Sequence, residues 1–538
     1  MTTQMKSLKK HITYFAAAAL TAAGLTSCSD FLTEYSQDLA KVEGWQDLDE
    51  VLLGDGYMHS SRIYIANSAV WNDGDVNGLN ILHYMTDEFD LYQDNYCDYL
   101  GVLDRMFPFY TWQQDTGTDK DLKYAGGDAQ YWNDLYSRIN VCNMVISLID
   151  DQPEYSLDDA GQKERVKGEA YFLRGLCYFF LANLYAQPYN PATAADLPGV
   201  PVKNTEYVED MEYDRGTLEA TYTQILDDLH AATGLLKGKT PKSKYHGSCE
   251  AALLMLSRVY LYMQDWDKAA DYADQVLAMN NRLLNLATVA DRSNSVSISS
   301  PETLFSMGNY LIAANFTSSR SGRDMPAFRV SDYMLDLYTR DDYRNGLYVG
   351  DADGGRYDGA FLKFNQQYNN WGGMNDVSSY CLLRTPEAYL TKAEALAYKG
   401  QDAQACKVLD SFLSTRMANP SPVSLSGNAL IDFIREERAR EFLLEGHRWF
   451  DLRRYTVCAE YPWSKVIDHS YNYYASYYFD YADVYRLEEY DDAYTLPIPR
   501  AIREFQVSLG NNPRPARQAN RVEDNGDDDD DWDDDWDW

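Results

Sequence analysis

The stretch Ile431–Tyr455, IDFIREERAREFLLEGHRWFDLRRY, decides the fold of this chain. As far as Glu445 it contains no proline or glycine, and it is rich in residues with a high preference for helix. Ile434, Phe442 and Leu443 recur at helical spacing, which predicts that one face of the helix is buried. A core helix is therefore expected here, with the chain turning back after it.

Charged residues fall on the same face of this helix. Arg438 lies four residues after Ile434 and Glu441 seven after it, so both lie on or beside the apolar stripe. Such charges must be paired, because a buried unpaired charge costs several kcal/mol. Gly446 suits a helix C-terminus, where a positive φ is often needed. We interpret the charges as a structural network rather than a catalytic site: Glu437, Arg438, Glu441, Glu445, Arg448 and Asp451.

The same stretch resembles the hallmark of the SusD/RagB family, E-R-x-x-E-x-x-x-E-G-x-R-x-x-D-L-x-R. The matching positions are Glu437, Arg438, Glu441, Glu445, Gly446, Arg448, Asp451, Leu452 and Arg454. Members of that family are surface lipoproteins of Bacteroidetes that capture nutrients, usually glycans, for a TonB-dependent outer-membrane transporter. Further segments resemble the family in the same order along the chain: Trp132–Ile149, Gln162–Ala186, Leu197–Val202, Arg215–Leu236 and Leu496–Pro513.

Two segments, Cys249–Met279 and Tyr389–Arg416, keep the spacing of small and aromatic residues seen in tetratricopeptide repeats. A single helical pair cannot bury its apolar face alone, so such repeats must stack. The expected fold is mainly α: a tetratricopeptide-like scaffold with long irregular loop insertions. We expect one SusD-like domain over residues 46–515, with helical repeats at about 132–280 and 386–455 and insertions at 61–114, 280–385 and 456–494.

The N-terminus has the features of a bacterial lipoprotein signal. A lysine-rich start precedes the short apolar run Tyr14–Ala23, which is too short to span a bilayer. The sequence LTSC then ends at Cys28, which predicts a signal peptide at 1–27, lipidation of Cys28 and a tether at 28–45. The chain is therefore expected on the outer membrane, lipid-anchored and surface-exposed. An ordinary secretory peptide with a chance cysteine is the alternative.

Composition narrows the classes of partner. The net charge of −35, from 83 acidic and 48 basic residues, argues against nucleic acid and against polybasic attachment to lipid. With Cys28 lipidated, seven of the eight cysteines remain, without a C-x-x-C pair, so neither a disulfide framework nor a zinc site is expected. The acidic tail at 516–538 is expected to be extended by self-repulsion.

Candidate ligand-binding residues come from the loop-rich insertions, because polar and aromatic side chains on loops are disproportionately functional. The 45 tyrosines offer flat apolar faces with a polar edge, which suit sugar rings, although most of them are expected to pack helices. The first insertion also holds MFPFYTWQQD, Met106–Asp115, and we place part of the binding surface on the whole loop-rich stretch Ser61–Gln114. The candidates are Trp71, Tyr92, Tyr96, Tyr99, Tyr310 and Trp371.

A calcium site is a further candidate in the first insertion. Asp73, Asp75, Asn77 and Gly78 match the first half of an EF-hand loop. The acidic residue that should end such a loop is replaced by Tyr84. A solvated turn is the alternative, and no other cofactor is expected.

Together, the resemblance implies oligosaccharide capture and delivery to a SusC-like TonB-dependent transporter, with no catalytic residue. Three alternatives stay open. A RagB-type member captures oligopeptides, and the negative charge would favour basic ones. A glycoside hydrolase needs two carboxylates flanking the bond, for which the sequence offers no specific pair. A purely structural scaffold would bind no small ligand.

Overall fold

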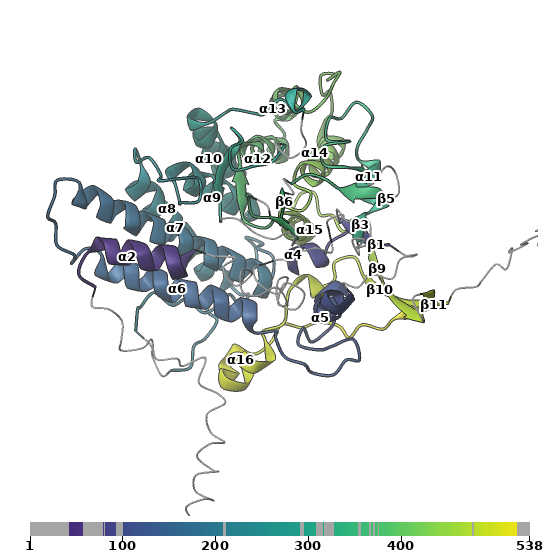
Figure 1. Ribbon diagram of the computed structural model, residues 1–538, viewed down its shortest axis with the longest axis horizontal. Helices are drawn as coiled ribbons and strands as arrows, with labels where there is room; N and C mark the ends of the chain where they lie inside the picture. Colours follow the sequence, from purple (N-terminus) through teal and green to yellow (C-terminus); the bar gives the residue numbers. More distant parts are fainter. Residues whose placement is uncertain are drawn as a thin grey trace, which may run out of the picture.

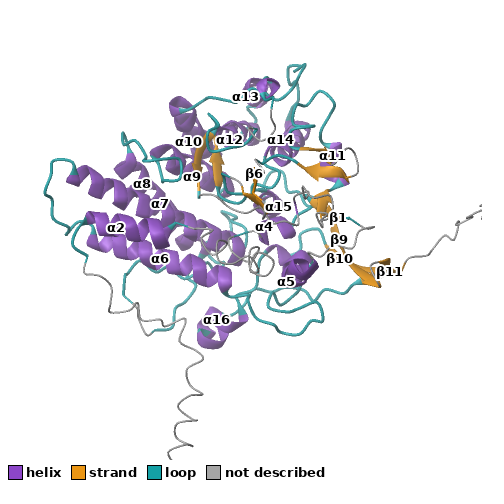
Figure 2. Cartoon of the chain, in the orientation of Figure 1, coloured by secondary structure: helices purple, strands orange, loops and turns teal. Residues whose placement is uncertain are grey.

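The computed structural model describes thirteen parts of the chain: residues 42–57, 79, 81–92, 100–207, 211–290, 295–307, 316, 328–352, 357–364, 367–369, 372–374, 376–475 and 478–523. They form a mainly helical scaffold with several small sheets, most of them on one side and one among the helices (Figure 2). The expected fold class is therefore confirmed. None of the described helices is both long and apolar enough to cross a membrane.

The scaffold is a series of helices in which each packs on the next, as the repeat pattern predicts, except that the last packs on the helix two places before it. Its members are α6 (Gln130–Leu148), α7 (Asp159–Tyr185), α8 (Leu218–Leu236), α9 (Cys249–Tyr262), α10 (Trp266–Met279), α12 (Thr385–Tyr398), α13 (Asp402–Leu413) and α14 (Gly427–Glu441). Near the N-terminus, α2 (Trp45–Val51) continues into a π-helical turn, η1 (Leu52–Gly56), and both pack on α7. Figure 1 shows α2, α6, α7 and α8 side by side at the left.

Local chemistry explains where these helices begin and how closely they approach. The side chain of Thr217 accepts a hydrogen bond from the Ala220 amide at the start of α8, and Asp265 does the same for Lys268 at the start of α10. A Cβ atom at Gly168 would lie 2.8 Å from Leu236 Cγ. Only glycine therefore allows α7 to approach α8 so closely.

The insertions add short elements to the scaffold. The first contains α4 (Ile81–Tyr84), β1 (Phe89–Leu91) and α5 (Leu100–Tyr110). The second contains η3 (Leu286–Thr288), β2 (Thr303–Ser306), β3 (Phe328–Val330), α11 (Asp332–Asp336), β4 (Val349–Ala352), β5 (Tyr357–Phe361), β6 (Gln367–Asn369), β7 (Gly372–Met374) and β8 (Leu382–Arg384). The third is the hairpin of β9 (Ile467–Ala475) and β10 (Tyr478–Leu487).

The remaining elements close the fold. After α14 comes α15 (Arg448–Thr456), and the C-terminal part holds η7 (Asp492–Tyr494), α16 (Arg500–Phe505), η8 (Val507–Leu509) and β11 (Asn520–Glu523). All strand pairings are antiparallel: β1 with β3, β2 with β8, β4 with β5, β6 with β7, and β9–β10–β11 as one sheet.

The helix expected to run to Glu445 ends earlier, at Glu441. The chain then turns through Leu444 and Gly446, whose φ angles are +55° and +75°. A Cβ atom on Gly446 would lie 3.0 Å from the Tyr380 Cα, so both the positive φ and the close approach require glycine. The early stop places Glu445 beside the second insertion.

The carboxylates of this stretch are paired inside the core. Glu441 accepts from Arg384 Nη1 and Arg416 Nη2, both at 3.0 Å, and Glu445 lies 2.5 Å from Lys363 Nζ. Burial raises the pKa of Glu441, but the charges of Arg416 and Arg384 outweigh this and hold the pKa well below its usual range. Among the described buried residues, five cations face five carboxylates here: Arg344, Lys363, Arg384, Arg416 and Arg440 with Glu302, Asp342, Glu437, Glu441 and Glu445. We call this set the hallmark network.

The end of the hallmark stretch also binds the first insertion. Arg448 donates from Nε and Nη2 to the two carboxylate oxygens of Asp87, each at 2.7 Å. Glu88 accepts from the Leu444 amide at 3.1 Å. Because the hallmark network also holds Lys363 and Arg384, the two insertions before α14 are fastened to the same short stretch of chain.

Candidate ligand-binding face

The three insertions meet on one side of the molecule, at its strands. β1 of the first insertion pairs with β3 of the second, with Phe89 opposite Val330 and Leu91 opposite Phe328. β1 also packs on β9 of the third insertion, and β3 packs on β5. Figure 1 shows these strands together at the right, away from α6, α7 and α8. We call this side the insertion face.

A buried aromatic cluster supports the insertion face from below. Phe316 stacks on Phe328, with ring centroids 4.9 Å apart and planes 20° apart. The rings of Phe89 and Tyr84 lie 4.6 Å and 5.0 Å from Phe316. Aromatic pairs of this kind contribute about 0.5–1.5 kcal/mol beyond their buried area. The cluster therefore gives β1 and β3 a firm base.

Tyr92 is the sequence-predicted ligand residue that the structure describes. It is half-buried and follows β1 directly. Its carbonyl oxygen lies 3.5 Å from Asn472 Nδ2 on β9, and the same amide lies 3.4 Å from the Tyr474 hydroxyl. Tyr474 in turn meets Phe479 of β10 edge to face at 6.2 Å. The structure thus brings the backbone of Tyr92 next to Asn472, which also contacts Tyr474 of the third insertion.

The other sequence-predicted residues lie outside the described parts of the chain. They are Cys28 for lipidation, Trp71, Tyr96, Tyr99, Tyr310 and Trp371 for ligand, and Asp73, Asp75 and Asn77 for calcium. Within the residues that the structure does describe, no three or more His, Cys, Asp and Glu side chains are placed to hold a metal ion.

One predicted part of the binding surface is wrong. The segment Met106–Asp115, included in the stretch where part of the binding surface was placed, forms the end of α5 and a buried turn. Phe107 meets Tyr471 of β9 edge to face at 5.1 Å, and Trp112 stacks on His469 at 4.2 Å. These rings are core residues because the hairpin β9–β10 covers them.

Asp87 and Glu88 are neighbouring carboxyl groups whose pKa values are shifted in opposite directions. Burial raises the pKa of Glu88 to about 7, whereas the Arg448 and Lys465 charges outweigh burial and hold the pKa of Asp87 well below its usual range. Such a divergence also marks acid–base catalysts. Here, however, Glu88 is 1% exposed and Asp87 is held by Arg448, so no substrate can reach the pair. We interpret this carboxyl pair as structural, because it holds the chain at the start of β1 in place.

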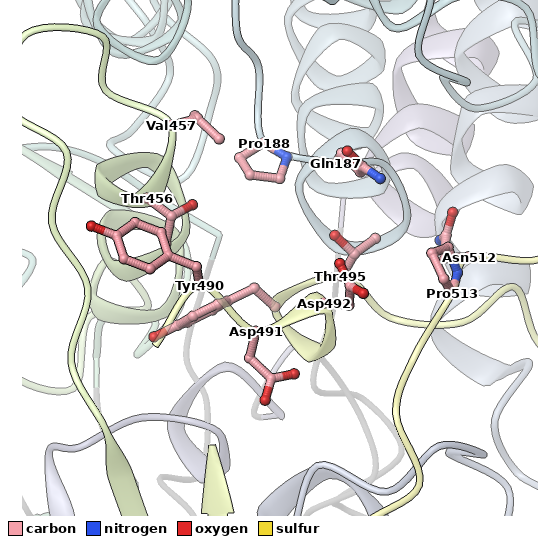
Figure 3. A pocket seen from close by; sticks show the side chains of 11 residues that line it. Gln187, Pro188, Thr456, Val457, Tyr490, Asp491, Asp492, Thr495, Asn512 and Pro513 are labelled. Carbon is pink, nitrogen blue, oxygen red and sulfur yellow. The ribbon is translucent and has the colours of Figure 1, made fainter. Parts of the chain in front are cut away.

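A separate small pocket lies between the end of α7, the end of α15 and the C-terminal segment (Figure 3). Its volume is about 190 Å³. Tyr490 stands at the pocket, 54% exposed, with a φ of +55° that tyrosine rarely adopts. The lining is rich in amide, hydroxyl and carboxylate groups: Gln187, Pro188, Thr456, Val457, Tyr490, Asp491, Asp492, Tyr494, Thr495, Asn512 and Pro513.

Sequence reasoning singled out none of Asn472, Tyr474, Phe479 or the pocket residues. The tyrosine-rich run of the third insertion was the available signal, but it does not say which rings face the core. Strand alternation would have separated them, since Tyr471 and Tyr473 lie on the opposite face of β9 from Asn472 and Tyr474.

Two family models match the chain. Residues 80–261 match a model described as starch-binding associating with outer membrane, and residues 338–513 match the SusD family. Among curated proteins, a SusD-like protein of Bacteroides ovatus is 22% identical over 393 residues, covering 64% of this chain and 68% of that protein. A SusD-like protein of Formosa agariphila is also 22% identical, covering 61% of this chain and 72% of that protein.

Solved structures share the fold at low sequence identity. A SusD-like carbohydrate binding protein of Bacteroides vulgatus superposes with a TM-score of 0.65 and 22% identity, covering 87% of this chain and 97% of that chain. A SusD superfamily protein of Bacteroides thetaiotaomicron gives the same TM-score and identity, covering 88% of this chain and 100% of that chain.

Proposed function

Because the chain belongs to the SusD/RagB family, we propose that it captures oligosaccharides at the cell surface and passes them to a TonB-dependent transporter of the SusC type. Members of the family are binding proteins of the outer membrane rather than enzymes. A carbohydrate ligand is named for the similar Bacteroides vulgatus structure, and we extend it to this chain.

The convergence of the three insertions at one face is the observation that carries this proposal. Binding residues are typically placed on loops that a rigid scaffold positions. Here the hallmark network and the Phe316 cluster supply the rigid part, and the half-buried Tyr92 and Tyr474 supply aromatic rings with polar edges. Rings with hydrogen-bonding edges suit the C–H faces and hydroxyls of sugars.

The location of the protein follows from the same proposal. Cleavage before Cys28 and acylation of its thiol would anchor the chain in the outer membrane. Anchoring by more than one acyl chain is stable, whereas a single chain holds only weakly. Calcium at Asp73, Asp75 and Asn77 is part of the proposal as a support for the ligand.

A binding screen tests the proposal directly. The soluble chain starting at Ser29 is tested against plant, microbial and mucin glycans and a basic peptide pool, each with and without EDTA. Retention of one glycan class is expected, and loss of retention with EDTA would place calcium in the site. If only peptides are retained, the proposed ligand changes from oligosaccharide to oligopeptide. If no ligand is retained, the proposal that the isolated protein captures ligand is contradicted.

Delivery needs its own measurement. Affinity purification of the full-length lipidated chain from its native outer membrane should recover a large TonB-dependent barrel in near-equal amount. Recovery of the lipoprotein without such a barrel, under detergents that keep other outer-membrane complexes intact, would contradict the transporter part of the proposal.

A further inference from the structure

The small pocket at the end of α7 is lined by polar side chains that have no partner within the described chain. Gln187, Asp492 and Thr495 all line it, and among the described residues their side chains make no hydrogen bond or ion pair. Thr495 is only 5% exposed, yet its hydroxyl oxygen is not among the sealed side-chain atoms, so a small molecule in the pocket can reach it. Because nearly all buried polar groups in native proteins are paired, these side chains point to a partner that enters the pocket.

The backbone around these groups is held in place. Asp491 pairs with Arg517, with Oδ1 2.6 Å from Nη2, and also accepts from two backbone amides. The amide of Tyr490 donates to Ser464 Oγ at 2.9 Å. On the opposite wall, the amide of Asn512 donates to two backbone carbonyls and accepts from a guanidinium. The pocket is therefore formed before any ligand arrives, which reduces the cost of ordering it on binding.

Tyr490 adds an apolar face to this set. Its side chain is 54% exposed, and its ring contacts no other aromatic ring within the described chain. Its φ of +55° is rare for a residue other than glycine, and such outliers cluster at ligand sites. In Figure 3, Tyr490 and Thr456 lie at the left of the view, and Asp492 and Thr495 lie toward its middle. A free ring beside free polar groups suits a ligand with one apolar face and polar edges.

Charge and size narrow the ligand further. Two carboxylates line the pocket, and Asp491 is paired with Arg517, whereas the exposed Asp492 has no cation partner among the described residues. An ionised carboxylate only accepts hydrogen bonds, so Asp492 favours hydroxyl groups and disfavours a second carboxylate. The volume of about 190 Å³ is below the roughly 300–1,000 Å³ of drug-sized ligand sites. The pocket therefore has room for one small, uncharged ring.

We propose that this pocket binds a single neutral pyranose ring, which rests on Tyr490 while its hydroxyls pair with the free polar side chains of the lining. The amide of Gln187 and the hydroxyl of Thr495 can each donate and accept, and Asp492 accepts. The hydroxyls of a sugar do both, so one ring can satisfy all three side chains. This inference rests on the proposed glycan capture and adds a second site, whose residues are separate from those of the insertion face.

Matched pairs of sugars test the charge of the site. The soluble chain starting at Ser29 is titrated, with binding followed by NMR, against the methyl glycosides of glucose and galactose and against the uronate of each, which differs only by a carboxylate at C6. At least one neutral glycoside should bind threefold or more tightly than its uronate. Asp492→Asn keeps the shape of the side chain but removes its charge, so it should bring the two members of that pair within twofold of each other. Asp432→Asn, at an exposed side chain of α14, is the matched control and should keep the preference.

Two further variants test the ring and the hydroxyl. Tyr490→Ala removes an exposed side chain without opening the core, and it should weaken binding of the neutral glycoside about fivefold. Thr495→Val removes one hydroxyl at nearly constant shape and should weaken it about threefold. Tyr155→Ala, at an exposed tyrosine between α6 and α7, is the control and should leave binding unchanged.

The failure of this inference can be told apart from the failure of the proposed function. No binding of either neutral glycoside, equal binding of each glycoside and its uronate, or full binding by both Tyr490→Ala and Thr495→Val would each overturn the inference. A chain that retains oligosaccharides in the binding screen but gives one of these results refutes the second site alone. A chain that retains no glycan refutes the proposed function.

Discussion

The hallmark network and the insertion face differ in how closely their polar side chains are paired. In the network, buried carboxylates such as Glu441 meet guanidinium groups at hydrogen-bonding distance. At the insertion face the polar contacts described for Asn472 are longer: its amide lies 3.5 Å from the Tyr92 carbonyl and 3.4 Å from the Tyr474 hydroxyl. The difference teaches that the shortest polar contacts lie beneath the insertions, whereas those at the proposed ligand-binding face are longer.

Removing one charge from the network should have the largest effect. Glu441→Gln keeps the shape of the side chain but leaves Arg384 and Arg416 short of a counter-charge. We expect a loss of about 3–5 kcal/mol in the free energy of unfolding, the scale for breaking a buried pair. Urea denaturation measures this loss.

The control for that change lies on the same helix. Glu436 is about half exposed and its carboxylate lies 3.7 Å from Arg440, so Glu436→Gln should change stability by less than about 1 kcal/mol. Similar losses for both variants would show that the network is no more important than surface charge.

Glu88 should give a smaller effect that depends on pH. Its folded pKa, raised by burial from 4.5 to about 7, means that the folded state holds a proton the unfolded state has released. The stability that this proton provides is complete below about pH 4.5 and is lost as the pH rises to about 7. The free energy of unfolding of Glu88→Gln, relative to that of the wild type, should therefore increase by about 1–3 kcal/mol as the pH rises from 4.5 to 7.5. Thermal unfolding across this range checks the sign, and a constant difference would contradict it.

A ring at the insertion face should matter least for stability but should matter for binding. Tyr474→Ala removes one half-buried ring, so we expect about fivefold weaker glycan binding, or roughly 1 kcal/mol, with the free energy of unfolding nearly unchanged. Tyr155→Ala, at an exposed tyrosine between α6 and α7, is the matched control. Equal binding by both variants would remove Tyr474 from the site.

The helices could be predicted from the sequence because their signals are local. The spacing of apolar residues in Gln162–Ala186 and of small residues in Cys249–Met279 gave α7, α9 and α10 nearly to the residue. The pairing of the hallmark charges also followed from their place on an apolar face. Their partners did not, since Lys363 and Arg384 lie far away in the sequence and carry no periodic signal.

The binding face was harder to predict because it depends on contacts between distant segments. Tyr92 reaches Asn472 only when β1 packs on β9, across 380 residues. Aromatic runs also look alike whether they are buried or exposed, which is why the rings of Met106–Asp115 were placed on the surface. The positive φ of Tyr490 cannot be read from residue types at all.

The fastening of the second insertion has a consequence for its geometry. Its anchors, Arg344, Lys363 and Arg384, lie about twenty residues apart, and all three end in the same buried set of carboxylates. The stretch between Arg344 and Lys363 and the stretch between Lys363 and Arg384 therefore begin and end at one cluster, so each leaves the core and returns to it as a closed loop.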